Sequence, residues 1–193
     1  MPSLANVIPD PPALLATIDA ACTNVGSHLH GPAHWRAVGW TGLELLAGEP
    51  AADPAVVLLF AMFHDSMRLD DGYDPQHGPR AAVFAASLHG RHFHLPDDRL
   101  KWLTRAIRDH TAGRLAGNPT IACCWDADRL NLWRVGVRPD PAFLSTETAR
   151  RPEVIERAAK LEGQRHGWDE IVRRHSELPP GDGDTKTAAT PQS

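Results

Sequence analysis

Histidine and aspartate residues able to do chemistry stand where the helical pattern of this sequence predicts buried positions. The clearest case is the unbroken apolar run at residues 58–63, which ends in the dipeptide His64-Asp65. A carboxylate at the end of a buried segment is costly unless a positive charge lies against it. Either the segment surfaces at this point, or the pair faces a cation. The second interpretation is favoured because four further segments carry comparable residues.

These further residues continue apolar stripes at helical spacing. Three histidines and one aspartate do so: His110 follows Leu100, Leu103 and Ile107; His77 precedes Ala81, Phe84 and Leu88; His34 aligns with Val38 and Leu45; and Asp128 shares a face with Ile121, Cys124 and Leu132. A lone inward histidine is more often a hydrogen-bonded core residue, and Asp128 alone could bond Arg108 or Arg129. Six such residues together predict one or two divalent transition-metal ions. Imidazole and carboxylate ligands suit iron, manganese, zinc, nickel or cobalt better than calcium.

The elements that must position these residues are predicted to be helices. Prolines and glycines separate segments of helical period, and no alternating strand pattern or hairpin signal is present. We expect helices at residues 11–24, 32–47, 53–66, 75–90, 96–112 and 120–134, with one or two more within 150–176. The predicted fold is all-α, a single-domain helical bundle over residues 1–176 with a central metal site. Residues 177–193 are predicted to form a disordered tail, because the end of the chain lacks large apolar side chains.

Composition narrows the function classes. The chain has 193 residues, and its 20 basic and 24 acidic residues give a formal net charge of −4, which argues against a nucleic-acid polymer as partner. No window approaches 18 uninterrupted apolar residues and the N-terminus shows no signal-peptide pattern, so no membrane association is expected. Three cysteines, two of them adjacent, suit a reducing cytoplasm. Both a monomer and a homodimer stay open.

The order of the chemical residues resembles a known signature. His34, His64-Asp65 and Asp128 together resemble the H…HD…D pattern of the HD-domain metal-dependent phosphohydrolase superfamily. The segments 63–65 (FHD) and 127–130 (ADRL) are similar to that family's namesake pair and to the segment bearing its last ligand. The resemblance covers about residues 28–135, and it implies an HD-type helical bundle around the metal site.

Two more segments, 77–82 (HGPRAA) and 107–110 (IRDH), resemble the third- and fourth-histidine segments of the binuclear branch of the superfamily. Their histidines, His77 and His110, complete an implied set of six ligands in which Asp65 would be the natural bridge between two ions. Eleven residues separate Asp65 from His77, a shorter interval than binuclear members usually show. His77 is therefore either a ligand of a second ion or a substrate contact beside a single ion.

The resemblance implies a phosphoester or phosphoanhydride substrate and a metal-activated water, with Asp65 at the catalytic centre. Arg68 stands about one turn beyond Asp65 and suits phosphate binding, although a surface pair with Asp70 or Asp71 is equally plausible. His30 is expected at the mouth of the site as an acid or a substrate donor, although a capping or solvated role is equally plausible. Asp70, Asp71 and Tyr73 in the loop at residues 69–78, and Arg80 beyond it, are predicted substrate contacts.

Three function classes stay open. The leading prediction is a metal-dependent phosphohydrolase that acts on a small phosphorylated metabolite or nucleotide. Some binuclear members of the superfamily have a similar six-ligand set but are diiron oxygenases that cleave a carbon bond with dioxygen. The third class is a non-catalytic domain that uses the pocket to bind a ligand.

Overall fold

The computed structural model describes residues 3–161 and 166–178, and within these ranges the chain is all-α, as predicted. The only β-type pairing among the described residues is an isolated bridge between His89 and Phe93. The elements are the α-helices α1 (Leu4–Val7), α2 (Pro11–Ala21), α3 (Pro32–Leu46), α4 (Pro54–Phe63), α5 (His77–Leu88), α6 (Asp97–Asp109), α7 (Pro119–Leu130), α8 (Glu147–Arg150), α9 (Pro152–Leu161) and α10 (Trp168–Ser176), and the 3₁₀ helices η1 (Asn131–Val135) and η2 (Pro141–Phe143).

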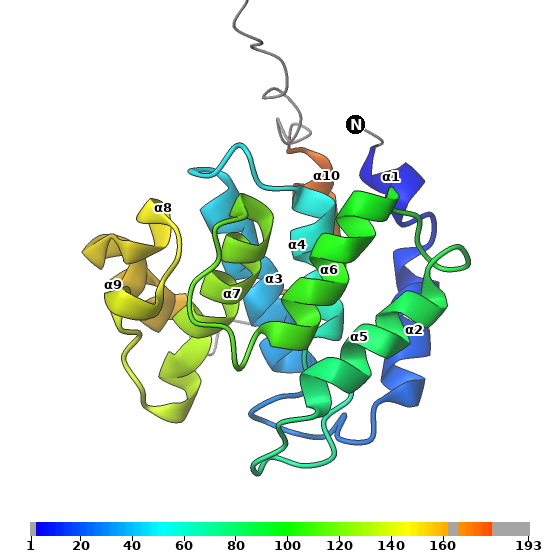
Figure 1. Ribbon diagram of the computed structural model, residues 1–193, viewed down its shortest axis with the longest axis horizontal. Coiled ribbons are helices and arrows are strands. Elements are labelled where there is room, and N and C mark those ends of the chain that lie inside the picture. Colours follow the sequence, from blue (N-terminus) through cyan, green and yellow to red (C-terminus); the bar gives the residue numbers. More distant parts are fainter. Residues whose placement is uncertain (1–2, 162–165, 179–193) are drawn as a thin grey trace, which may run out of the picture.

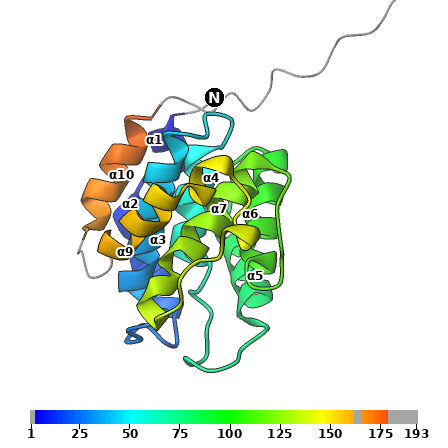
Figure 2. The same cartoon turned by 90° about the vertical axis from the view of Figure 1, so that its left-hand side faces the viewer.

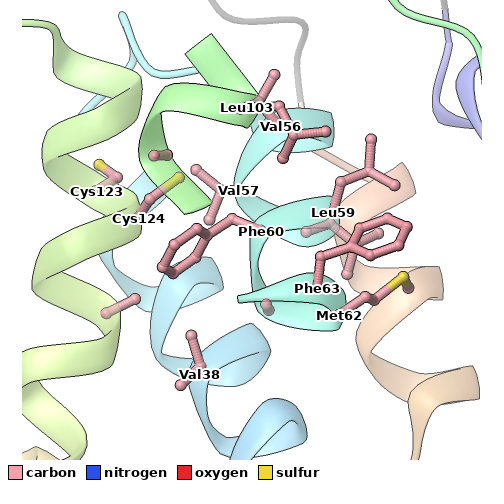
Figure 3. Packing of buried hydrophobic residues seen from close by; sticks show 14 of the residues in the cluster. Val38, Val56, Val57, Leu59, Phe60, Met62, Phe63, Leu103, Cys123 and Cys124 are labelled. Carbon is pink, nitrogen blue, oxygen red and sulfur yellow. The ribbon is translucent and has the colours of Figure 1, made fainter. Parts of the chain in front are cut away.

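Helix α4 is the centre of the bundle. Every residue from Ala55 to Phe63 is buried, because α4 is apolar on all sides and is packed by α3, α6, α7 and α10. Figure 3 shows Phe60 of α4 pointing toward α7, which carries the buried Cys123 and Cys124. A fully buried side chain of this size contributes about 1.5–3 kcal/mol through removal from water. Packing in the core therefore fixes the position of α4 and of the two residues that follow it, His64 and Asp65.

The N-terminus of α4 is held by a buried ion pair. Asp53 is the N-cap, and its carboxylate accepts hydrogen bonds from the backbone N–H groups of Ala55 (2.9 Å) and Val56 (3.1 Å). Arg99 of α6 places Nη1 2.7 Å from Asp53 Oδ2, and both side chains are buried. This contact ties α4 to α6 at the end of the bundle opposite His64 and His110, which cap the other ends of these helices.

Helix boundaries differ from the sequence prediction at functionally relevant places. The predicted helix 53–66 ends at Phe63, and His64 and Asp65 lie in the turn that follows. The predicted helix 120–134 is α-helical only to Leu130 and continues as η1. Among the described residues of the range 150–176, α9 and α10 are the helices expected there, while α1, α8 and η2 were not predicted. Beyond residue 178 the predicted tail lies outside the described residues.

Helices α3 to α6 run alternately up and down the bundle, so that the start of α3, the ends of α4 and α6 and the start of α5 meet at one end (Figures 1 and 2). The loop at residues 22–31 and the loop at residues 64–76 lie side by side there, joined by a hydrogen bond from Thr23 Oγ1 to the carbonyl of Arg68 (2.8 Å). Within the described ranges, no helix combines the length and the apolar character that crossing a membrane requires.

Candidate metal centre

Six side chains converge at this end of the bundle. His34 lies in the first turn of α3, His64 caps the C-terminus of α4, His77 is the first residue of α5, and His110 caps the C-terminus of α6. Asp65 follows His64, and the sixth residue, Asp128, lies near the end of α7. The four histidines and Asp65 are buried, and the Asp128 side chain is 19% exposed. The structure therefore brings together all six predicted ligands.

The first group of donor atoms comprises His34, His64, Asp65 and Asp128. The Nε2 atoms of the two histidines are 3.1 Å apart, and each lies 3.6 Å from Asp65 Oδ2. Asp128 Oδ1 lies 3.2 Å from His34 Nε2 and 3.9 Å from His64 Nε2. Ligands about 2.1 Å from one ion lie about 3.0 Å apart at right angles and about 3.4 Å apart at tetrahedral angles. The observed spacings therefore suit donor atoms that share a transition-metal ion.

The second group comprises Asp65, His77 and His110. The Nε2 atoms of the two histidines are 3.0 Å apart, and they lie 3.2 Å and 3.6 Å from Asp65 Oδ1. Asp65 therefore presents one carboxylate oxygen to each group. These two sets of residues could hold two metal ions with Asp65 between them.

Backbone carbonyls fix the orientation of three of the imidazole rings. The carbonyl of Ile107 accepts a hydrogen bond from His110 Nδ1 (2.7 Å), that of Ala61 from His64 Nδ1 (3.2 Å), and that of Asp74 from His77 Nδ1. Because a carbonyl only accepts, each Nδ1 carries the proton, and in the neutral ring Nε2 presents its lone pair to the cluster. Facing lone pairs at 3.0 Å repel one another unless a proton or a metal cation lies between them. This ring orientation is typical of histidines that bind metal.

Burial and neighbouring charges set the protonation of the cluster. Burial lowers the pKa of His64 to about 3, and burial together with the cation of Arg134 lowers the pKa of His34. Burial alone would raise the pKa of Asp65, but the charges and hydrogen bonds of His64, His110 and His77 outweigh it and hold that pKa well below its usual value. Most of the cluster thus has the deprotonated donors that metal binding needs.

His110 differs from the other histidines in its titration. Burial acts to lower its pKa, yet the hydrogen bond and charge of Asp65 prevail and raise it. A metal ion bound by His110 must displace this proton, so metal binding by the second group is coupled to pH.

Gly78 allows the second group to form. A Cβ atom at this position would lie 2.8 Å from the backbone carbonyl oxygens of both Ile107 and Arg108, closer than real Cβ contacts. The first turn of α5 therefore packs directly against the last turn of α6, and this contact brings His77 to His110.

Arg68 and Arg80 have partners within the protein. Arg68 Nε lies 3.0 Å from Asp65 Oδ1, so it pairs with the central carboxylate rather than with Asp70 or Asp71. Arg80 donates to the carbonyl of Met67 (2.8 Å) and also pairs with Asp74. Both arginines stabilise the loop beside the metal centre, and their predicted substrate contacts stay predictions.

The loop residues differ in their surroundings. Tyr73 is 94% exposed, and Asp70 accepts a hydrogen bond from the backbone of Gly72 (2.8 Å), as in a solvated turn. Asp71 instead joins the two loops, since its Oδ1 lies 3.0 Å from His30 Nδ1 and accepts from Asn24 Nδ2 (3.1 Å). A hydrogen bond from Ser27, followed by those from His30 and Asn24, lowers the pKa of Asp71.

His30 is held beside the cluster. Its ring centroid lies 6.4 Å from that of His34, its backbone carbonyl accepts from the indole of Trp35 (2.6 Å), and its Nδ1 faces Asp71. His30 is thus an imidazole oriented by a carboxylate at the edge of the candidate metal centre.

Two polar residues beside the cluster were not predicted. The Arg134 guanidinium acts electrostatically on both His34 and Asp128 and donates through Nε to the carbonyl of Leu29 (2.8 Å). Thr111 Oγ1 lies 3.3 Å from His77 Nε2. No periodic signal in the sequence relates Arg134 to Asp128, because the 3₁₀ helix η1 breaks the α-helical spacing between them. Thr111 had one sequence signal, its position directly after His110.

Comparisons of this chain with protein-family models, with curated proteins and with solved structures gave no match.

Proposed function

We propose that this protein is a metal-dependent phosphohydrolase of the HD-domain type, acting on a small phosphorylated metabolite. The observation that carries the proposal is the pair of donor groups that share Asp65, with Oδ2 facing His34 and His64 and Oδ1 facing His77 and His110. When bound, divalent ions in such a site lower the pKa of a coordinated water and neutralise charge on a phosphoryl group.

The residues of the chain have distinct roles in this proposal. Asp65 orients both donor groups, and Arg68 holds the Asp65 carboxylate in place through the contact at Oδ1. Arg134, beside His34 and Asp128, supplies positive charge toward which a phosphoryl group is drawn. His30, oriented by Asp71, gives a proton to the leaving group. The buried walls of the cluster limit the access of bulk water.

A second candidate function is a diiron oxygenase. The specific observation in its favour is the second donor group itself, because hydrolysis can proceed on one ion and a redox pair needs two. Four imidazoles and two carboxylates suit iron as well as manganese. The two functions differ in the identity and redox state of the metal, not in the ligands.

The experiment that separates these functions is a metal count on protein purified without oxygen, together with activity measurements. We expect one or two divalent ions per chain and release of inorganic phosphate from a panel of small phosphate esters. Two iron atoms with oxygen uptake and no phosphate release would overturn the phosphohydrolase in favour of the oxygenase. Protein that retains no metal after dialysis against iron, manganese, zinc, nickel or cobalt would refute both the phosphohydrolase and the oxygenase.

Three variants make the test specific. Asp65→Ala removes the oxygen atoms shared by both groups and should abolish metal binding and activity. His77→Ala should remove one ion and leave the first group. His94→Ala is the matched control, because His94 is exposed on the loop between α5 and α6, away from the cluster.

A further inference from the structure

A cleft of about 590 Å³ opens beside the metal centre, between the segment that follows α6 and the segment that follows α7. One wall begins at Thr111, directly after His110, and Thr111 Oγ1 lies 3.3 Å from His77 Nε2. The other wall begins at Arg129, directly after Asp128. Thr111 thus borders both the cleft and the second donor group, and the volume of the cleft falls within the range of small-molecule sites.

The cleft has an exposed apolar wall. Phe143 is 47% exposed and Val137 is 50% exposed, and both line the cleft together with Leu132. Large apolar side chains grouped in a concave surface are typical of a site that takes an organic ligand. Phe143 is the only aromatic residue among those that line the cleft.

Positive charge complements this wall. Arg129 is fixed by hydrogen bonds to the carbonyls of Arg114 (2.8 Å) and Phe143 (2.6 Å), and Arg138 pairs with Glu156 (2.9 Å). Arg114 differs from both, because among the described residues its guanidinium has neither a hydrogen-bond partner nor an ion-pair partner. Its guanidinium lies over the ring of Phe143, 5.7 Å from the ring centroid. A flat donor group above an aromatic face is a combination that binds a second flat ring bearing hydrogen-bond acceptors.

We propose that this cleft binds a heteroaromatic ring carried by the phosphorylated substrate. The ring lies against Phe143, Arg114 donates to its acceptor atoms, and the phosphoryl group points past Thr111 to the metal centre. This inference rests on the proposed function for the phosphoryl end of the ligand, but not for the ring end.

The test is a binding measurement on metal-loaded protein, which does not depend on turnover. Isothermal titration calorimetry compares the hydrolysis-resistant phosphonate analogues of adenosine 5′-monophosphate and of ribose 5-phosphate, the second of which lacks the adenine base. We expect the ring to improve the affinity at least about tenfold, in line with stacking on one aromatic side chain. Phe143→Ala should remove the preference for the probe with the base and leave the binding of the probe without it unchanged. Arg114→Gln should reduce this preference. Val83→Ala, which shortens an exposed apolar residue on α5, is the matched control.

The outcomes separate this inference from the proposed function. Equal affinities for the two probes, or a ring preference that survives in folded Phe143→Ala protein with unchanged metal content, would overturn the cleft assignment. Hydrolysis of small phosphates without ring preference would leave the phosphohydrolase intact and refute only the cleft. A Phe143-dependent ring preference without any phosphate release would support the cleft and contradict the phosphohydrolase.

Discussion

Replacement of Gly78 by alanine should break the second donor group while leaving the first intact. The added Cβ would lie 2.8 Å from the carbonyl oxygens of Ile107 and Arg108. Ordinary contact begins at 3.4 Å, and 3.4 − 2.8 leaves a shortfall of about 0.6 Å. Both neighbours are backbone atoms of α6, so the start of α5 must move away by about that amount.

The displacement acts directly on His77, the residue before Gly78. Metal sites tolerate deviations of only about 0.2 Å in ligand distances, so a shift of about 0.6 Å is roughly three times that tolerance. We expect the affinity of the second group for a divalent ion to fall about 10- to 100-fold, as when supporting contacts of metal ligands are lost. The first group should keep its ion, because His34 and His64 belong to other helices.

The assay is the number of ions per chain after equilibrium dialysis against a series of manganese concentrations. Gly117→Ala is the matched control, since a Cβ there meets nothing within 4 Å. Thermal stability should change little, because the helix gains about 1 kcal/mol from alanine and loses a comparable amount through the clash. A Gly78→Ala protein that binds two ions as tightly as the parent would refute the reasoning.

Three further predictions concern stability and turnover. Burial lowers the pKa of His175 to about 4, so below pH 6.5 the unfolded chain binds a proton that the native chain does not bind. The free energy of unfolding should therefore fall by up to about 3 kcal/mol between pH 6.5 and pH 4. His175→Gln should flatten this pH dependence in urea titrations. Asp53→Ala should lower the free energy of unfolding by about 3 kcal/mol in chemical denaturation, because it removes the N-cap of α4 and the carboxylate that faces the buried Arg99. Asp10→Ala, at the exposed N-cap of α2, should lower it by about 1 kcal/mol. Asp71→Asn should lower turnover of a phosphate ester at least about tenfold with unchanged metal content, and an unaltered rate would remove His30 from the proposed mechanism.

Local sequence patterns were sufficient to predict the longer helices and the six inward residues of the cluster. The apolar run before His64 and the Asp53-Pro54 start define α4, because an N-cap and an all-round apolar surface act within one segment. His110 could be placed on an inward face for the same reason, since it continues the stripe of α6. The helix boundaries were predicted less well, because the ends of α4 and α7 depend on contacts with other segments.

Pairings between distant segments could not be predicted. Asp71 binds His30 across 41 positions of the chain, and Arg134 reaches Leu29 across 105. Neither pairing has a periodic signal, since each depends on how two loops meet at the end of the bundle. The same is true of Arg68, which the sequence allowed to pair with Asp70 or Asp71 and which the structure pairs with Asp65.

The sequence by itself predicted the kind of chemistry, through six side chains able to bind metal that lie on, or directly after, the inward faces of five helices. Tertiary structure alone decided how they combine. The packing of Gly78 against α6 brings His77 to His110, and the turn after α4 aims one oxygen of Asp65 at each group. Helical periodicity fixes the face on which a side chain lies, whereas distances of 3 Å between helices depend on how closely their backbones approach.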